Sequence, residues 1–114
     1  MSTQKWSDEI TVAELGDDPS FSDDLVSLLD STQAEPADLV LNFAAVSFVN
    51  SSNVAKLLRL RKQISSAGKR LVLCGVNTQV WGIFLVTGLD KIFDFTNDIS
   101  TALTTLQVGK AEKD

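Results

Sequence analysis

Residues 39–54, LVLNFAAVSFVNSSNV, contain the pattern that decides the fold. Leu39–Phe43 form a short, mostly apolar run, as in a central strand that is covered on both faces. Asn50–Asn53 follow, four consecutive residues of types that favour helix N-termini. From about 52 to 67, leucines and an isoleucine fall on one broad side, and Gly68 ends the pattern. A buried strand that leads directly into a helix is typical of an α/β fold.

The same alternation of strand and helix extends along the rest of the chain. Strands are predicted over 9–15, 71–76 and 91–95, and helices over about 20–33, 78–88 and 97–106. Such an order implies a mostly parallel sheet with right-handed crossovers. We expect a single α/β domain at 9–107, with a four- to five-stranded, mostly parallel sheet and about four helices. Flexible ends are expected at 1–8 and 108–114.

Composition excludes several classes of function. The chain has 114 residues, with no histidine and a single cysteine, Cys74. Histidine-dependent nucleophiles and imidazole-ligated zinc are therefore ruled out, and no glycine-rich phosphate motif is present. Cys74 lies in an apolar strand pattern, as a buried, inert thiol does. Asp17-Asp18 and Asp23-Asp24 fit a solvated acidic face better than a magnesium site. We expect no enzymatic activity, metal, cofactor or small-molecule substrate.

The charge is unevenly distributed along the chain. The net charge is −5, yet residues 1–50 hold ten acids against Lys5 alone, whereas residues 51–114 hold nine bases against five acids. Phosphate backbones repel an acidic chain, which argues against a nucleic-acid partner. The first residues lack the apolar core of a signal peptide, and no apolar stretch reaches the roughly 18 residues that span a bilayer. We expect a cytoplasmic protein that does not span a membrane.

The strand-to-helix junction is the most informative candidate site. Parallel α/β sheets present their functional loops at the carboxyl ends of strands, and Ser51 is predicted there. Phosphorylation of Ser51 would add about −1.5 to −2 charges at a helix start, where the helix dipole tolerates them. A partner that had buried the neutral hydroxyl would then dissociate. The alternative is that Asn50 or Ser51 caps the helix and has no other role.

Two further features suggest a protein interface. Lys56, Arg59 and Lys62 lie on the side of their helix opposite the apolar stripe, where they either complement an acidic partner or are simply solvated. Trp81 and Leu85 lie away from the inward stripe of the next helix. An exposed tryptophan beside an apolar residue favours an interface. The alternative is that both pack under the chain termini.

Several segments resemble the STAS family, which contains the bacterial anti-sigma factor antagonists and their relatives. These segments are the run at 39–54, Leu57-Leu58, Lys62-Gln63-Ile64, residues 68–76, Val80 with Ile83-Phe84, and residues 87–93. The likeness covers about 39–106 and is weaker over 1–38. It implies a non-catalytic regulatory module whose partner is a kinase that is itself the anti-sigma factor. The family's phosphorylated serine corresponds by position to Ser51, and ATP and magnesium would belong to the kinase.

Two positions depart from the family signature Asp-Ser-(Ser/Thr)-Gly. Asn50 stands in place of the Asp and Asn53 in place of the Gly. An asparagine still caps a helix but carries no negative charge, and Asn53 adds a side chain to a surface that the family keeps bare for its partner. The resemblance and the charge pattern together give the expected partner-binding residues: Asn50, Ser51, Ser52, Asn53, Lys56, Arg59 and Trp81.

A second interpretation keeps the fold and drops the phosphoswitch. The chain would then be a STAS module such as a soluble subunit of a lipid-transport ABC system or a component of a signalling scaffold. Asn50 and the Trp81–Leu85 patch favour this interpretation.

Overall fold

Strand β3, Asp38–Ala45, lies at the centre of the sheet, in the computed structural model that describes residues 1–113. Leu39, Leu41 and Phe43 belong to one hydrophobic cluster, whereas Val40 belongs to a second. Because side chains alternate along a strand, the two clusters occupy the two faces of the sheet. The central, doubly covered strand that the sequence predicted is confirmed.

The described chain has five strands, and from the second strand onward strands and α-helices alternate. The strands are β1 Ser2–Lys5, β2 Ile10–Gly16, β3, β4 Leu71–Cys74 and β5 Asp94–Thr96. The helices are α1 Ser20–Ala34, α2 Ser51–Ser66, α3 Thr78–Thr87 and α4 Ile99–Lys113, with a 3-10 turn at Leu89–Lys91. The sheet order is β1-β2-β3-β4-β5, in which β1 is antiparallel to β2 and all other neighbours are parallel. The predicted α/β fold class is therefore confirmed.

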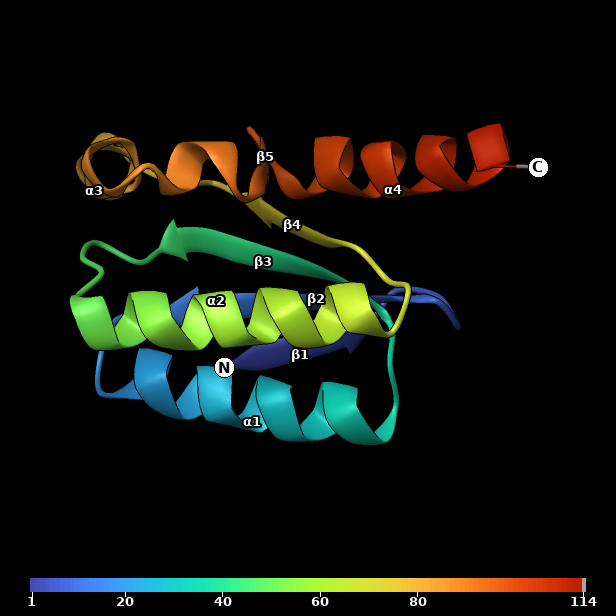
Figure 1. Ribbon diagram of the computed structural model, residues 1–114, viewed down its shortest axis with the longest axis horizontal. Helices are drawn as coiled ribbons and strands as arrows, with labels where there is room; N and C mark the ends of the chain where they lie inside the picture. The colour runs from blue at the N-terminus through green and yellow to red at the C-terminus, as the bar shows by residue number, and fades with distance from the viewer. Residues whose placement is uncertain (114) are drawn as a thin grey trace.

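Helices cover both faces of this sheet (Figure 1). The larger cluster takes side chains from α1, α2 and α3, whereas the smaller one takes Ala102 and Leu106 from α4. In the larger cluster the Phe43 ring packs edge-on against Phe21 and Phe84, with ring centroids 5.7 and 6.2 Å apart. This packing fixes α1 and α3 on β3 and thereby positions the loops at its carboxyl end.

Polar side chains define where the helices begin. Asn50 caps α2 and Asn77 caps α3, each accepting a hydrogen bond from a backbone N–H three residues later. The residue before α1 is Pro19, which makes no side-chain cap hydrogen bond. Asp18 Oδ1 instead accepts hydrogen bonds from the backbone N–H and the hydroxyl of Ser22, at 2.8 and 2.9 Å.

The ends of the chain differ from expectation. Ser2–Lys5, which were expected within a flexible N-terminus, form the edge strand β1. All four residues are exposed, so backbone pairing alone makes this strand, and no apolar alternation marks it in the sequence. The predicted tail at 108–114 is helical as far as Lys113, and residue 114 lies outside the described residues.

Candidate functional site

Ser51 lies at the edge of the sheet where the parallel strands end. β3 ends at Ala45, a short loop follows, and Ser51 is the first residue of α2. Its side chain is exposed, and its hydroxyl forms no hydrogen bond within the described chain. Phe48, three residues earlier, is 62% exposed. This edge therefore presents a hydroxyl without a hydrogen bond close in sequence to an exposed aromatic ring. Phe48 is not among the partner-binding residues expected from the sequence.

The cap of α2 is formed by two asparagines, which leaves Ser51 unused. Asn50 Oδ1 accepts a hydrogen bond from the Asn53 N–H at 2.8 Å, and Asn53 Oδ1 accepts one from the Asn50 N–H at 2.9 Å. This reciprocal arrangement is a capping box. The sequence allows either Asn50 or Ser51 as the cap, and the geometry assigns the cap to Asn50.

Asn53 is only 1% exposed, which corrects its expected role as a surface contact. Its Nδ2 donates to Asp18 Oδ2 at 3.2 Å and to Ser22 Oγ at 3.0 Å, so the side chain turns inward to the β2–α1 turn. Asn50 Nδ2 also donates to Asp18 Oδ2, at 3.2 Å. Both departures from the family signature therefore bind one carboxylate. Asn53 holds the start of α2 in place and leaves the surface bare.

A second carboxylate of the same turn holds the loop that follows β3. Asp17 Oδ1 accepts a hydrogen bond from the Ser47 N–H at 2.7 Å, and Oδ2 accepts one from the Ser47 hydroxyl at 2.6 Å. Asp17 and Asp18 are exposed, as expected of a solvated acidic face, but each also anchors the site. We call Asp17, Asp18, Ser47, Asn50 and Asn53 the clasp. The feature of the sequence that indicates the clasp is a pair of polar segments, one after β2 and one after β3, which are neighbouring parallel strands.

Hydrogen bonds lower the pKa of both clasp carboxyls. The main cause is the Ser47 hydroxyl for Asp17 and the Ser22 backbone N–H for Asp18. A carboxyl whose pKa is lower in the folded state adds stability above its unfolded pKa, near 3.8, and loses it as the pH falls through the folded pKa. The clasp is therefore expected to weaken in acid.

We expect the free energy of unfolding to fall as the pH drops from about 5 to about 3. Asp17→Asn, which keeps an oxygen for the Ser47 N–H, should make this dependence shallower because one depressed carboxyl is gone. Urea unfolding followed by circular dichroism at several pH values measures both slopes. Identical slopes for the variant and the wild type would show that Asp17 does not contribute.

The two basic residues that are expected to contact a partner differ in burial and in hydrogen bonding. Lys56 is partly buried, and its Nζ donates to Ser52 Oγ at 2.9 Å. Arg59, one turn further along α2, is exposed. These residues share one helix with Ser51, so a partner that contacts the start of α2 reaches Lys56 within about 8 Å along the axis.

Trp81 is partly buried, and it packs neither as an open patch nor under the chain termini. Its ring lies edge-on to Phe95 of β5, with centroids 5.0 Å apart. Both rings line a cavity of about 300 Å³ at the carboxyl edge of β4 and β5, together with Val76, Thr96 and Asn97. Leu85 is 50% exposed, as expected. The tryptophan is thus tied to the core, and α3 presents Leu85 and Val86 to solvent.

Metal and thiol chemistry find no support in the described part of the chain. Among residues 1–108, whose side chains the structure describes, no three His, Cys, Asp or Glu side chains are grouped so that they could hold a metal ion. Cys74 is buried, and burial raises the pKa of its thiol to about 11, so the thiol stays protonated at neutral pH. Within the same residues, no helix combines the length and apolar character needed to cross a bilayer.

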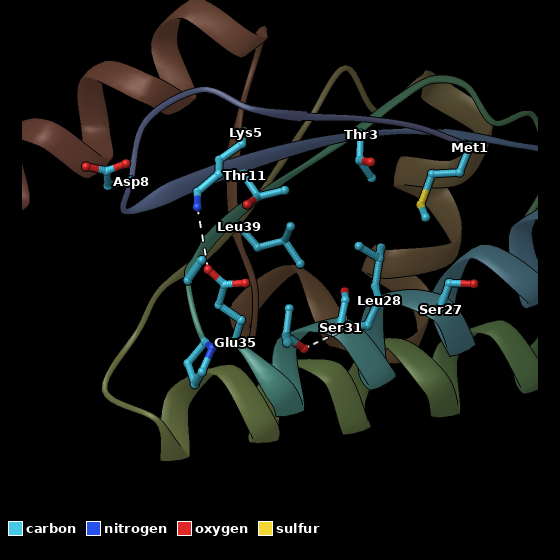
Figure 2. A pocket seen from close by; sticks show the side chains of 13 residues that line it. Met1, Thr3, Lys5, Asp8, Thr11, Ser27, Leu28, Ser31, Glu35 and Leu39 are labelled. Atoms are coloured by element: carbon cyan, nitrogen blue, oxygen red, sulfur yellow. Dashed lines mark hydrogen bonds and ion pairs between the residues drawn. The ribbon is translucent and has the colours of Figure 1, made fainter.

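A separate groove lies between β1 and the second half of α1 (Figure 2). It has a volume of about 290 Å³, and Leu28 and Leu39 lie among its lining residues. Lys5 Nζ lies 3.5 Å from Glu35 Oε1, and both of these exposed side chains also line the groove. None of the predicted partner-binding residues lines this groove, so it does not belong to the clasp edge.

Comparison with known proteins places the fold. The STAS domain profile matches residues 11–102. A variant of RsbS from Moorella thermoacetica aligns with a TM-score of 0.82 at 19% identity, covering 96% of this chain and 97% of that one. A STAS domain protein from Planctomyces limnophilus, described as an anti-sigma-factor antagonist, gives 0.80 at 19%, covering 93% and 97%. The phosphorylated form of Bacillus SpoIIAA gives 0.71 at 17%, covering 91% and 96%. The structures agree with the fold, and because the profile covers most of the chain, the protein belongs to the STAS domain family.

Proposed function

We propose that this chain is a regulatory protein-binding module, similar to anti-sigma factor antagonists, in which phosphorylation of Ser51 by a partner kinase releases that partner. The observation that carries the proposal is the free hydroxyl of Ser51, exposed at the first residue of α2. One of the structurally similar proteins, SpoIIAA, was solved in a phosphorylated form. The proposed setting is the cytoplasm, where the kinase would bind ATP and transfer its terminal phosphate to Ser51.

The capping box supports a switch that leaves the fold intact. Asn50 and Asn53 accept each other's backbone N–H groups at the start of α2, so a phosphate on Ser51 displaces no capping contact. The helix dipole also favours a negative group at this end. The added negative charge therefore acts mainly on the bound partner, because it lies in an interface that had buried a neutral hydroxyl.

The proposed docking surface consists of Phe48, Ser51, Ser52, Lys56 and Arg59, with Asn50 at its edge. Phe48 supplies the exposed aromatic anchor, and Arg59 supplies positive charge one helical turn beyond Lys56. Charged groups at the rim speed and orient the encounter more than they add affinity. An acidic surface on a kinase-type anti-sigma factor fits this arrangement. Trp81 is left out because it packs on Phe95.

The test compares Ser51→Asp, Ser51→Ala and the neighbouring control Ser52→Asp. Calorimetric titration against the kinase-type anti-sigma factor that copurifies from the native host measures affinity. Ser51→Asp should bind at least about tenfold more weakly, because its charge enters the interface, with an unchanged circular dichroism melt. Ser51→Ala should bind like the wild type but accept no phosphate, and Ser52→Asp should lose less affinity. Equal affinity for wild type and Ser51→Asp would refute the switch.

A second candidate function, a scaffold or transport-linked STAS module without a phosphoswitch, is favoured by Asn50. An asparagine here offers no carboxylate to orient the serine hydroxyl for a kinase. Its side-chain amide instead donates a hydrogen bond to Asp18. The fold also occurs in a sulfate transporter family protein from Wolinella succinogenes and in the stressosome, described as a signal integration hub. Mass spectrometry of protein from its native host decides, since phosphate on Ser51 under any growth condition contradicts this candidate.

A further inference from the structure

Opposite charges are separated between two neighbouring helices. α1 and α2 lie side by side and run in the same direction (Figure 1). α1 carries three aspartates and no base, whereas α2 carries four bases and no acid. The surface of this helix pair therefore has an acidic strip along α1 and a basic strip along α2.

The outward charges of the two strips are not neutralised within the chain. The exposed members are Asp23 and Asp30 on α1 and Arg59, Arg61 and Lys62 on α2. Of these, Arg61 donates from Nε to the Ile92 carbonyl oxygen. Among residues 1–108, whose side chains the structure describes, the other four charges take part in no ion pair and make no side-chain hydrogen bond. These charges are therefore free to meet a complementary surface.

Hydrogen bonds between the helices fix which residues lie at the same level. Near the start, Asn53 Nδ2 donates to Ser22 Oγ, and further along, Gln63 Nε2 donates to the Leu29 carbonyl oxygen. The partners in these bonds are 31 and 34 positions apart in the sequence. By this register Asp30 lies level with Lys62. Val26 lies level with Leu58 and Arg59.

Symmetry then selects one way in which two copies meet. A twofold axis across the helices would place α1 on α1 and acid on acid. An axis parallel to the helices places α1 of one copy on α2 of the other at the same level, so that Asp30 meets Lys62 in both halves. Val26 and Leu58, 46% and 37% exposed, then face each other near the middle. We infer that the α1–α2 face is a self-association surface for a second copy of this chain.

The expected dimer is weak and sensitive to salt. Exposed ion pairs contribute little individually, and the apolar contact is small, so the protein should exchange between monomer and dimer. Screening lengths shrink from about 14 Å at 0.05 M salt to about 4 Å at 0.5 M. Self-association should therefore weaken clearly over that range. Arg59 belongs both to this face and to the proposed docking surface, so the test substitutes Lys62, which lies outside that surface and about 16 Å along α2 from Ser51.

Sedimentation equilibrium of the purified protein in low salt tests the inference, using Asp30→Lys, Lys62→Glu and their equimolar mixture. Each variant alone should self-associate at least about tenfold more weakly, because both symmetric contacts become like-charged. The mixture should regain wild-type association, because each contact again pairs opposite charges. A doubly substituted chain should also regain it, and circular dichroism checks that every variant folds.

Two results would overturn the inference. One is a wild-type chain that stays monomeric at low salt. If Lys62→Glu then weakens the binding of another protein, the basic strip serves that protein and not a second copy. The other is association that both single variants retain, or that the mixture fails to restore. Neither result bears on the Ser51 switch, which is measured by titration with the kinase.

Discussion

Replacing Phe43 with alanine is expected to lower the free energy of unfolding by about 3–5 kcal/mol. The side chain is fully buried in the carboxyl-terminal half of β3, and its ring packs edge-on against Phe21 of α1 and Phe84 of α3. Alanine removes apolar surface and leaves a cavity between elements that cannot all move inward together. Urea denaturation followed by circular dichroism gives the difference. A loss below about 1 kcal/mol would show that the core around β3 closes over the gap.

Phe48→Ala is the matched control, since it removes the same side chain five residues later. Phe48 is 62% exposed, so its loss should change the free energy of unfolding by no more than about 0.5 kcal/mol. The pair separates an aromatic ring that stabilises the fold from one that is offered to a partner. If Phe48→Ala were as destabilising as Phe43→Ala, the loop after β3 would be part of the core.

The central elements were predictable because local and tertiary signals agree there. An apolar run such as Leu39–Phe43 suits only a strand that is covered on both faces, and the asparagines at 50 and 77 mark helix starts by the same capping chemistry that the structure uses. Strand β1 was not predictable in this way. Its four side chains are all exposed, and only its backbone pairing with β2 defines it.

The position of the candidate site was predictable, but its internal contacts were not. Ser51 follows from the strand-to-helix junction alone, and it lies exposed there. The role of Asn53 depends on Asp18, which is 35 residues away in sequence and reaches it only because β2 and β3 are parallel neighbours. Pattern analysis of one helix places Asn53 at its start but cannot supply the carboxylate that turns its side chain inward.

Asn53→Ala is expected to lower the free energy of unfolding by about 2 kcal/mol. The substitution leaves the half-buried Asn50 N–H without its capping partner and removes one donor each from Asp18 Oδ2 and Ser22 Oγ. Ser52→Ala is the control, because it changes the adjacent, exposed residue and should cost no more than about 0.5 kcal/mol. Equal effects of the two substitutions would mean that the clasp does not stabilise the start of α2.

Asn53→Asp separates the hydrogen bonds from mere packing, because it keeps the shape of the side chain. The new carboxylate can still accept the Asn50 N–H, but it has no hydrogen to donate to Asp18, and it buries a second negative charge next to that carboxylate. Its pKa should rise in the folded state, so the loss of stability relative to wild type should exceed that of Asn53→Ala at neutral pH. The deficit should shrink as the pH falls toward about 4, where protonation restores a donor. A variant as stable as wild type at neutral pH would show that Asp18 is not held by Asn53, and the start of α2 would then depend on the reciprocal cap alone.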